Sequence, residues 1–188
     1  MGFRAERTRV TIRLKACGRR GQIEELIYME TPERKLLWYG ALLFLLGLLT
    51  GFVEVRFTNM RMGLSAHLEG VMNGTFVLVL GAIWGQLSLP RIAETTAYGT
   101  LLYGTYGNWV VTVLAAVFGT AANTPIAAAG HSGKPWQESL IAAGFLSVAI
   151  SMIACTLLVL WGLSGRERVK IWNNAAPKLS GGAEGWRK

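Results

Sequence analysis

The chain has 188 residues, of which 52% are hydrophobic and only 16% are charged, and its formal net charge is +8. Soluble domains carry about 25% charged residues, so this composition indicates a membrane protein. All 11 acidic residues are Glu, and the absence of Asp excludes aspartate-based phosphotransfer, EF-hand calcium loops and aspartic dyads.

Residues 1–35 are predicted to be a basic cytoplasmic tail. They hold nine of the 19 Lys and Arg residues, and they contain no apolar run long enough for a cleaved signal peptide. Met29 is an alternative first residue of the native chain. The basic side chains suit an anionic lipid surface or a simple cytoplasmic flank, and nucleic-acid binding is not expected.

Four uncharged apolar runs follow, and each is long enough to cross a bilayer, which takes about 20 residues. The runs cover residues 36–53, 70–90, 98–119 and 139–163, and the helix of the second run is expected to begin a turn earlier, near Leu64. The predicted fold is therefore an all-α membrane bundle of four helices over residues 36–165. A second basic tail, residues 166–188, completes the chain.

The distribution of Lys and Arg predicts the topology. The two tails and the loop around Arg91 carry 16 of these residues, whereas the two opposite loops carry three. Because positive charge is retained in the cytoplasm, both termini are expected to be cytoplasmic. The longest loop, residues 120–138, lies on the other side and is either a lid over a site or a solvated connector.

The second span opens with the segment RMGLSAHLEGVMNG, residues 61–74, which is the part of the membrane region richest in polar groups. On a helical projection, His67 lies within about 100° of Gly63, Gly70, Gly74 and Gly81. Such a stripe permits close approach of another helix. Alternatively, a flat ligand lies against Gly70 and Gly74 while His67 reaches its centre, and a porphyrin fits because imidazole is a usual haem ligand.

Two further polar residues follow on the same helix. Asn73 lies about 120° around from His67 and is expected to reach the space above such a ring. Glu69 shares the side of Asn73, four residues away. It is a candidate for holding Asn73 in place, for pairing with Arg61 or Arg56, or for handling a proton.

The third span opens with YGTLLYGTYGNWVVT, which contains Tyr103, Tyr106, Asn108 and Trp109. Tyr and Trp near the end of a span usually form an interfacial belt. Asn108 fits a belt less well, because an amide that deep is expected to bond across helices or to line a cavity.

The blocks FTNMRMGLSAHLEGVMNGTFVLVLGAIW, residues 57–84, and YGTYGNW resemble the hydroxylaminobenzene mutases, which are small bacterial membrane proteins. The resemblance covers about residues 36–165. The first block also resembles, more distantly, the styrene oxide isomerases, in which a second-span histidine binds haem b and an asparagine six residues later faces the substrate. The spacing from His67 to Asn73 matches that pattern.

This resemblance implies an enzyme of the bacterial cytoplasmic membrane that shifts a hydroxyl group within a small aromatic substrate, from an arylhydroxylamine to a 2-aminophenol. It implies haem b on His67, with ferric iron as a Lewis acid and Asn73 orienting the oxygen. It also implies a homotrimer in membrane lipid. In the isomerases a third-span tyrosine assists, but Thr112 stands at that position here, so either Tyr106 replaces it or no phenol is used.

Three other functions stay open at this level. An epoxide isomerase is the nearest, and the sequence does not determine the natural aryl substrate. A non-catalytic membrane cytochrome is disfavoured, because His67 and His131 are the only histidines and His131 lies in the long loop rather than in a facing span. A transport or scaffold protein without a cofactor would lack the Soret absorbance band that the other functions predict.

Overall fold

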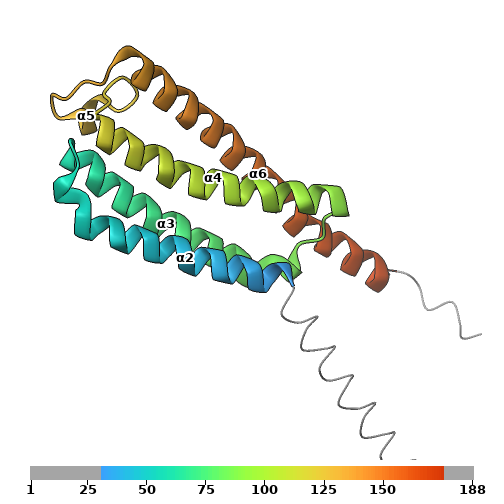
Figure 1. The fold of residues 1–188 in the computed structure, drawn as a ribbon. Coiled ribbons are helices and arrows are strands. Elements are labelled where there is room, and N and C mark those ends of the chain that lie inside the picture. The colour runs from blue at the N-terminus through green and yellow to red at the C-terminus, as the bar shows by residue number, and fades with distance from the viewer. Residues whose placement is uncertain (1–30, 176–188) are drawn as a thin grey trace, which may run out of the picture.

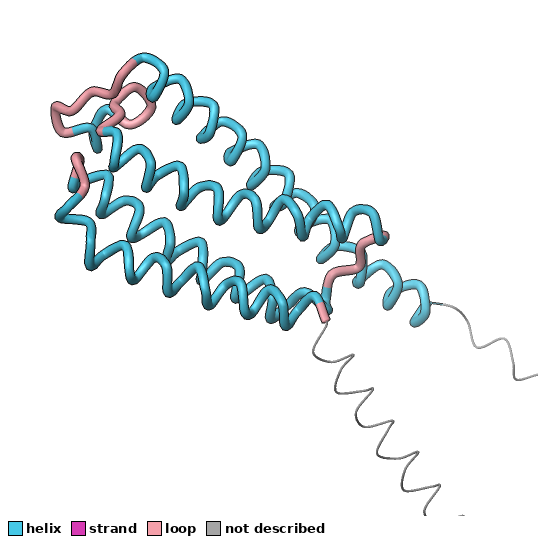
Figure 2. The backbone as a smooth tube through the Cα atoms, in the orientation of Figure 1, coloured by secondary structure: helices cyan, strands magenta, loops and turns pink. Residues whose placement is uncertain are grey.

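The computed structural model describes residues 31–175, with side chains described to residue 164. Four long helices run side by side along one direction (Figure 1). They are α2 (Pro32–Val53), α3 (Met60–Ile83), α4 (Arg91–Phe118) and α6 (Pro135–Ala175). The connecting segments contain the short helices η1 (Glu54–Arg56), η2 (Trp84–Gln86) and α5 (Pro125–Ala128). Figure 2 shows that the rest of the described chain is loop, without strands. Most of the two predicted basic tails lies outside the described residues.

The four predicted spans are confirmed as helices of sufficient length and apolarity to cross a membrane, with 25 to 30 residues each. Their outer surfaces carry large exposed apolar side chains, as lipid-facing helices do, for example Leu146, Ile150, Ile153 and Leu157 on α6. The all-α membrane fold is therefore confirmed. The orientation of the termini across the membrane stays a prediction.

All four long helices begin earlier than predicted, and α6 also continues to Ala175, beyond the predicted end at residue 163. Helix α3 begins at Met60 rather than near Leu64, and α4 begins at Arg91 rather than at Tyr98. The prediction counted uncharged apolar runs, whereas the helices also include residues that precede each run, charged residues among them. The helical backbone continues through Arg61 and Arg91, because a charged side chain near a span's end extends its head group toward water.

Glycine positions bring α2 and α3 into close contact. A Cβ added at Gly40 would lie 2.7 Å from the backbone N of Leu78, and one at Gly47 would lie 2.5 Å from the backbone N of Val71. A Cβ at Gly74 would meet the backbone of Phe44. Small residues that let two backbones touch are a common way to join membrane helices, where the hydrophobic effect does not drive association.

This packing predicts that Gly74→Ala destabilises the bundle. The added methyl group would overlap backbone atoms of α2, and the overlap is relieved only if the two helices move apart. This should lower the free energy of unfolding by about 1–3 kcal/mol. Gly99→Ala is the matched control, because a Cβ at Gly99 meets nothing within 4 Å. Thermal unfolding in detergent, followed by circular dichroism, should give a lower midpoint for Gly74→Ala alone. Equal midpoints for the two variants would contradict this account of the interface.

The long loop is an ordered cap on one end of the bundle. The carboxylate of Glu138 accepts hydrogen bonds from the backbone N–H groups of Ala121, Ala122 and Gly133, at 2.9 to 3.2 Å. The amide of Asn59, at the start of α3, donates to the carbonyl oxygens of the α5 segment, Ala127 and Ala128. These bonds tie the loop to the first turns of α3 and α6.

Candidate active site

The imidazole of His67 is held against α2. Its Nδ1 lies 2.8 Å from the carbonyl oxygen of Gly47. A carbonyl oxygen can only accept, so this bond places the proton on Nδ1 and leaves the lone pair of Nε2 available. This is the arrangement in which protein histidines bind a metal, with the second nitrogen anchored to a backbone carbonyl.

Gly51, one turn after Gly47, provides the room for this ring. A Cβ at Gly51 would lie 2.8 Å from Nδ1 of His67 and 3.1 Å from its Cε1. The first distance is shorter than real Cβ contacts and the second is unusually tight, so the imidazole packs on a bare backbone. The sequence analysis missed Gly51, although its position one turn after Gly47 was a usable signal.

His67 lines an open groove of about 380 Å³ on the outer face of α2 and α3. The other lining residues are mostly apolar and come from the end of α2, from η1 and from the start of α3: Leu48, Gly51, Phe52, Glu54 and Leu64. Phe52 is 81% exposed, so this wall of the groove faces outward from the single chain. None of the residues of the 120–138 loop contributes to the lining, and the proposed lid therefore does not cover His67 here.

Glu54 is a second residue that the sequence analysis missed. It lines the same groove as His67, and its Oε2 is buried without a hydrogen-bond partner among the described residues. A buried carboxylate oxygen without a partner is costly, and a bound ligand would explain it. The predicted first span ended at Val53 because Glu54 is charged, which removed this residue from consideration.

The flat-ligand interpretation expected open space beside Gly70 and Gly74, and the structure has α2 there instead. A Cβ at Gly70 would meet the backbone of Gly47, and one at Gly74 would meet the backbone of Phe44. Helix α2 therefore fills the space beside both residues. The structure supports the other interpretation of this glycine stripe, close approach of a second helix. A porphyrin face does not fit against Gly70 and Gly74.

The other predicted polar residues meet between α3 and α4. The amide Nδ2 of Asn73 donates to Oε2 of Glu69 at 3.2 Å, and more weakly to the carbonyl oxygen of Thr105 at 3.4 Å. The amide Nδ2 of Asn108, on α4, donates to the same Oε2. One carboxylate oxygen thus joins two amides, one from α3 and one from α4, and Figure 1 shows these two helices side by side.

The cluster of Glu69, Asn73 and Asn108 bears on two of the three alternatives given for Glu69, and a role of this residue in proton transfer stays a prediction. Its carboxylate holds Asn73, and in the described part of the chain it forms no ion pair with Arg61 or Arg56. Asn108 bonds across helices, as its depth in the span suggested. Asn73 is nine-tenths buried, whereas Glu69 and Asn108 are partly exposed.

Tyr106 and Thr112 lie outside this cluster's hydrogen bonds. The hydroxyl of Tyr106 donates to the carbonyl oxygen of Tyr39 at 2.7 Å, and that of Thr112 donates to the carbonyl oxygen of Asn108 at 2.8 Å. Trp109 binds across to α2 rather than forming part of a belt, since its Nε1 donates to Oγ1 of Thr50 at 3.1 Å. Tyr103 is 55% exposed, as a belt residue would be.

The site therefore has two parts on different faces of α3. His67 faces the groove beside α2, whereas the cluster faces α4, and none of its residues lines the groove. One part offers an imidazole lone pair, and the other offers fixed amides and a carboxylate. Within residues 31–164 no group of three His, Cys or acidic side chains could hold a bare metal ion.

Comparison with known proteins adds the following similarities. The family model described as styrene oxide isomerase matches residues 32–164. Hydroxylaminobenzene mutase HabB of Ectopseudomonas oleovorans is 52% identical over 131 residues, which are 69% of this chain and 80% of the relative. Hydroxylaminobenzene mutase HabA of the same organism is 38% identical over 125 residues, 66% of this chain and 93% of the relative. No solved structure matches.

Proposed function

Because this chain belongs to the styrene oxide isomerase family, we propose that it converts arylhydroxylamines, such as hydroxylaminobenzene, into 2-aminophenols. The chain is a membrane isomerase of the mutase type. The proposed substrate class rests on the chain's 52% identity to a hydroxylaminobenzene mutase over most of that relative's length. The proposed location is the cytoplasmic membrane of a bacterium.

The proposed reaction is balanced within one molecule. The N–O bond of the hydroxylamine breaks, and a C–O bond forms at the ortho carbon of the ring. That carbon loses its proton, the nitrogen gains one, and the ring regains its aromaticity. Nitrogen is reduced by as much as carbon is oxidised, so the reaction needs neither an external oxidant nor a reductant.

Haem b is the proposed cofactor, and the geometry of His67 fits it. A porphyrin supplies four nitrogen ligands of its own, so one imidazole is enough, whereas a bare ion would need a cluster that the described residues lack. Nε2 of His67 would hold the group, and the carbonyl oxygen of Gly47 fixes the ring and its tautomer. When bound, the iron would supply a Lewis acid with an open coordination position that polarises the N–O bond.

The chain's own polar groups would orient the substrate. Asn73 uses its amide hydrogens on Glu69 and Thr105, so its carbonyl oxygen remains available to accept from an N–H or O–H group. Glu69 keeps both amides in one position, and a fixed amide contributes more to a reaction than a mobile one. The burial of Asn73 would help to keep bulk water from the electron-poor ring of the substrate.

A second copy of the chain would close the open side of the His67 groove. In a single chain the His67 groove and the cluster do not share a space, and the groove opens outward beside the exposed Phe52. A neighbouring copy packed on that face would close the groove. We therefore propose a homo-oligomer, with three copies as the resemblance to the isomerases implies, and native mass measurement of the purified complex tests this number.

Gly51→Ala is predicted to displace the imidazole of His67. The added Cβ would overlap the ring, so the ring must move and its bond to Gly47 must break. We expect haem retention to weaken by about 10–100-fold, the usual effect of losing an outer-shell partner of a metal ligand. Haem titration, followed by Soret absorbance, measures the effect, with Gly99→Ala as the matched control. Unchanged retention in Gly51→Ala would separate His67 from the haem site.

The activity itself is tested with purified protein and two substrates in parallel, hydroxylaminobenzene and styrene oxide. We expect 2-aminophenol from the first, without any added reductant, and with the substrate's own oxygen when the buffer is prepared in ¹⁸O-water. Full incorporation of ¹⁸O would exclude the internal transfer. Turnover of styrene oxide alone would assign the chain to epoxide isomerisation instead.

A further inference from the structure

A second pocket lies at the opposite end of the bundle from the ordered loop, beside the first turns of α2 and α4. It has a volume of about 330 Å³ and is lined by Lys35, Trp84, Arg91, Glu94 and Tyr98, among others. Neither the His67 groove nor the Glu69 cluster shares a residue with it. The volume lies within the range of about 300–1,000 Å³ that small-molecule sites occupy.

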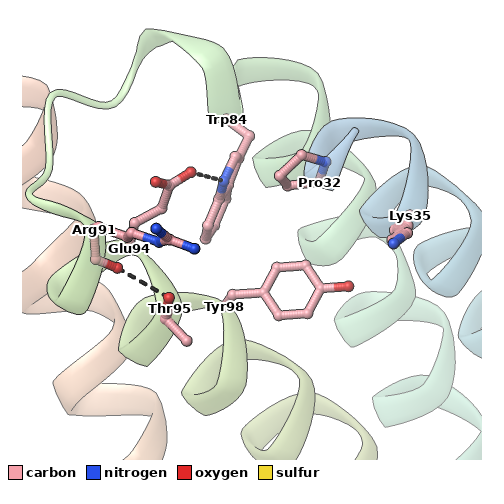
Figure 3. Close-up of a pocket in the computed structure, with 7 residues that line it drawn as sticks. All are labelled: Pro32, Lys35, Trp84, Arg91, Glu94, Thr95 and Tyr98. Atoms are coloured by element: carbon pink, nitrogen blue, oxygen red, sulfur yellow. Dashed lines mark hydrogen bonds between the residues drawn. The ribbon is translucent and has the colours of Figure 1, made fainter. Parts of the chain in front are cut away.

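Two cations face this pocket from different helices. Lys35 belongs to α2 and Arg91 to α4, and neither forms an ion pair within the described residues. Figure 3 shows the guanidinium of Arg91 extending beneath the indole of Trp84, while the phenol ring of Tyr98 extends toward the side that carries Lys35. A negatively charged group between Lys35 and Arg91 would meet positive charge from both sides.

The acidic residue in the lining does not cancel this charge. Glu94 accepts a hydrogen bond from Nε1 of Trp84 at 3.2 Å, which turns one carboxylate oxygen toward the indole. The lining thus keeps two positive charges against one negative charge. The excess of positive charge in the lining favours an anionic ligand.

The walls are aromatic as well as basic. Trp84 is 2% exposed and packs edge-on against Tyr98, with ring centroids 6.0 Å apart. A second hollow, lined by Arg34, Lys35, Trp38 and Tyr39, shares Lys35 with the pocket. Trp38 is 61% exposed, as expected for a tryptophan at the level of lipid head groups.

From this arrangement we propose that the pocket binds the phosphate group of an anionic phospholipid, with Lys35 and Arg91 attracting the phosphate and with Tyr98 contacting the glycerol part. Lys35 and Arg91 stand in the first turns of membrane-spanning helices, which is where lipid phosphates lie. Basic pockets between membrane helices are known to take such head groups. A free phosphate ion has the same charged group but no attached lipid.

The experiment compares the full-length protein with two double variants in nanodiscs of phosphatidylcholine that contain phosphatidylglycerol. Lys35→Gln with Arg91→Gln removes both cations of the pocket. Arg56→Gln with Arg61→Gln removes two exposed cations at the other end of the bundle and is the matched control. Native mass spectrometry after release into neutral detergent counts the phosphatidylglycerol that each chain retains.

We expect the wild-type chain and the control to retain one phosphatidylglycerol per chain, and the pocket variant to bind it at least about tenfold more weakly, because each cation near a lipid surface contributes measurably. Lys35→Arg with Arg91→Lys keeps the charge and should retain the lipid, which separates lost charge from lost folding. Equal retention in all variants would overturn the proposal. Displacement of the lipid by millimolar inorganic phosphate would assign the pocket to a soluble anion instead.

This inference rests on the chain's being a membrane protein and not on the proposed reaction. Lipid retention requires neither haem nor turnover, so it can be measured on protein without either. If the wild-type protein retains the lipid but has no mutase activity, only the proposed function is contradicted. If the wild-type protein has mutase activity but retains no lipid, only the proposal of a lipid site in this pocket is contradicted.

Discussion

His67→Ala should purify without haem and should lose its mutase activity by about 100-fold or more, because the chain offers no second imidazole in a span to replace the ligand. The carbonyl oxygen of Gly47 fixes the ring of His67, with Nε2 left free. The measurement is the Soret absorbance per chain together with turnover of hydroxylaminobenzene.

The matched control is His131→Ala, which removes the other histidine, in the loop that caps the bundle. It should keep haem and activity. Circular dichroism should give the same helical content for both variants, since His67 is held to α2 by a single bond. Full haem content in His67→Ala would mean that another group binds the iron, and would contradict the assignment.

Glu69→Ala should lower activity by about 100-fold, the effect of misplacing a positioning group by about 1 Å. Its Oε2 accepts from both Asn73 and Asn108, so the truncation releases two amides together. Soret absorbance should remain normal, because the cluster contributes nothing to the His67 groove. Steady-state turnover of the haem-loaded protein measures the loss.

Glu69→Gln separates positioning from proton transfer at the same residue. Both hydrogen bonds end on one oxygen, and the amide oxygen of Gln can accept both, so a positioning role predicts that most activity survives. Loss of activity in Glu69→Gln to the level of Glu69→Ala would show that the carboxylate handles a proton. Normal activity in Glu69→Ala would remove the cluster from the reaction altogether.

The membrane fold could be predicted from sequence because bilayer thickness sets a length that an apolar run must reach. Four runs met it, and four helices were found. The ends were less accurate, since a charge ends an uncharged run without ending a helix. This rule left Arg61 of α3 and Arg91 of α4 outside the predicted spans. It also removed Glu54 from consideration, which follows α2 and lines the His67 groove.

Within one helix, the sequence also determined relative directions. A spacing of four residues predicted that Glu69 and Asn73 share a side, and the hydrogen bond between them is present. A spacing of six predicted that His67 and Asn73 point apart, and they lie on different faces of α3. These results depend only on 3.6 residues per turn, which is a local property of the chain.

Only the tertiary structure decided which neighbour covers each face. The spacing of Gly70 and Gly74 suits either a flat ligand or another helix, and the close approach of α2 selects the helix. In the same way, the bond from His67 to Gly47 and that from Asn108 to Glu69 each join residues more than 15 positions apart in the chain. The packing of whole helices sets such contacts, because periodicity gives an angle on one helix but not the identity of the partner that it faces.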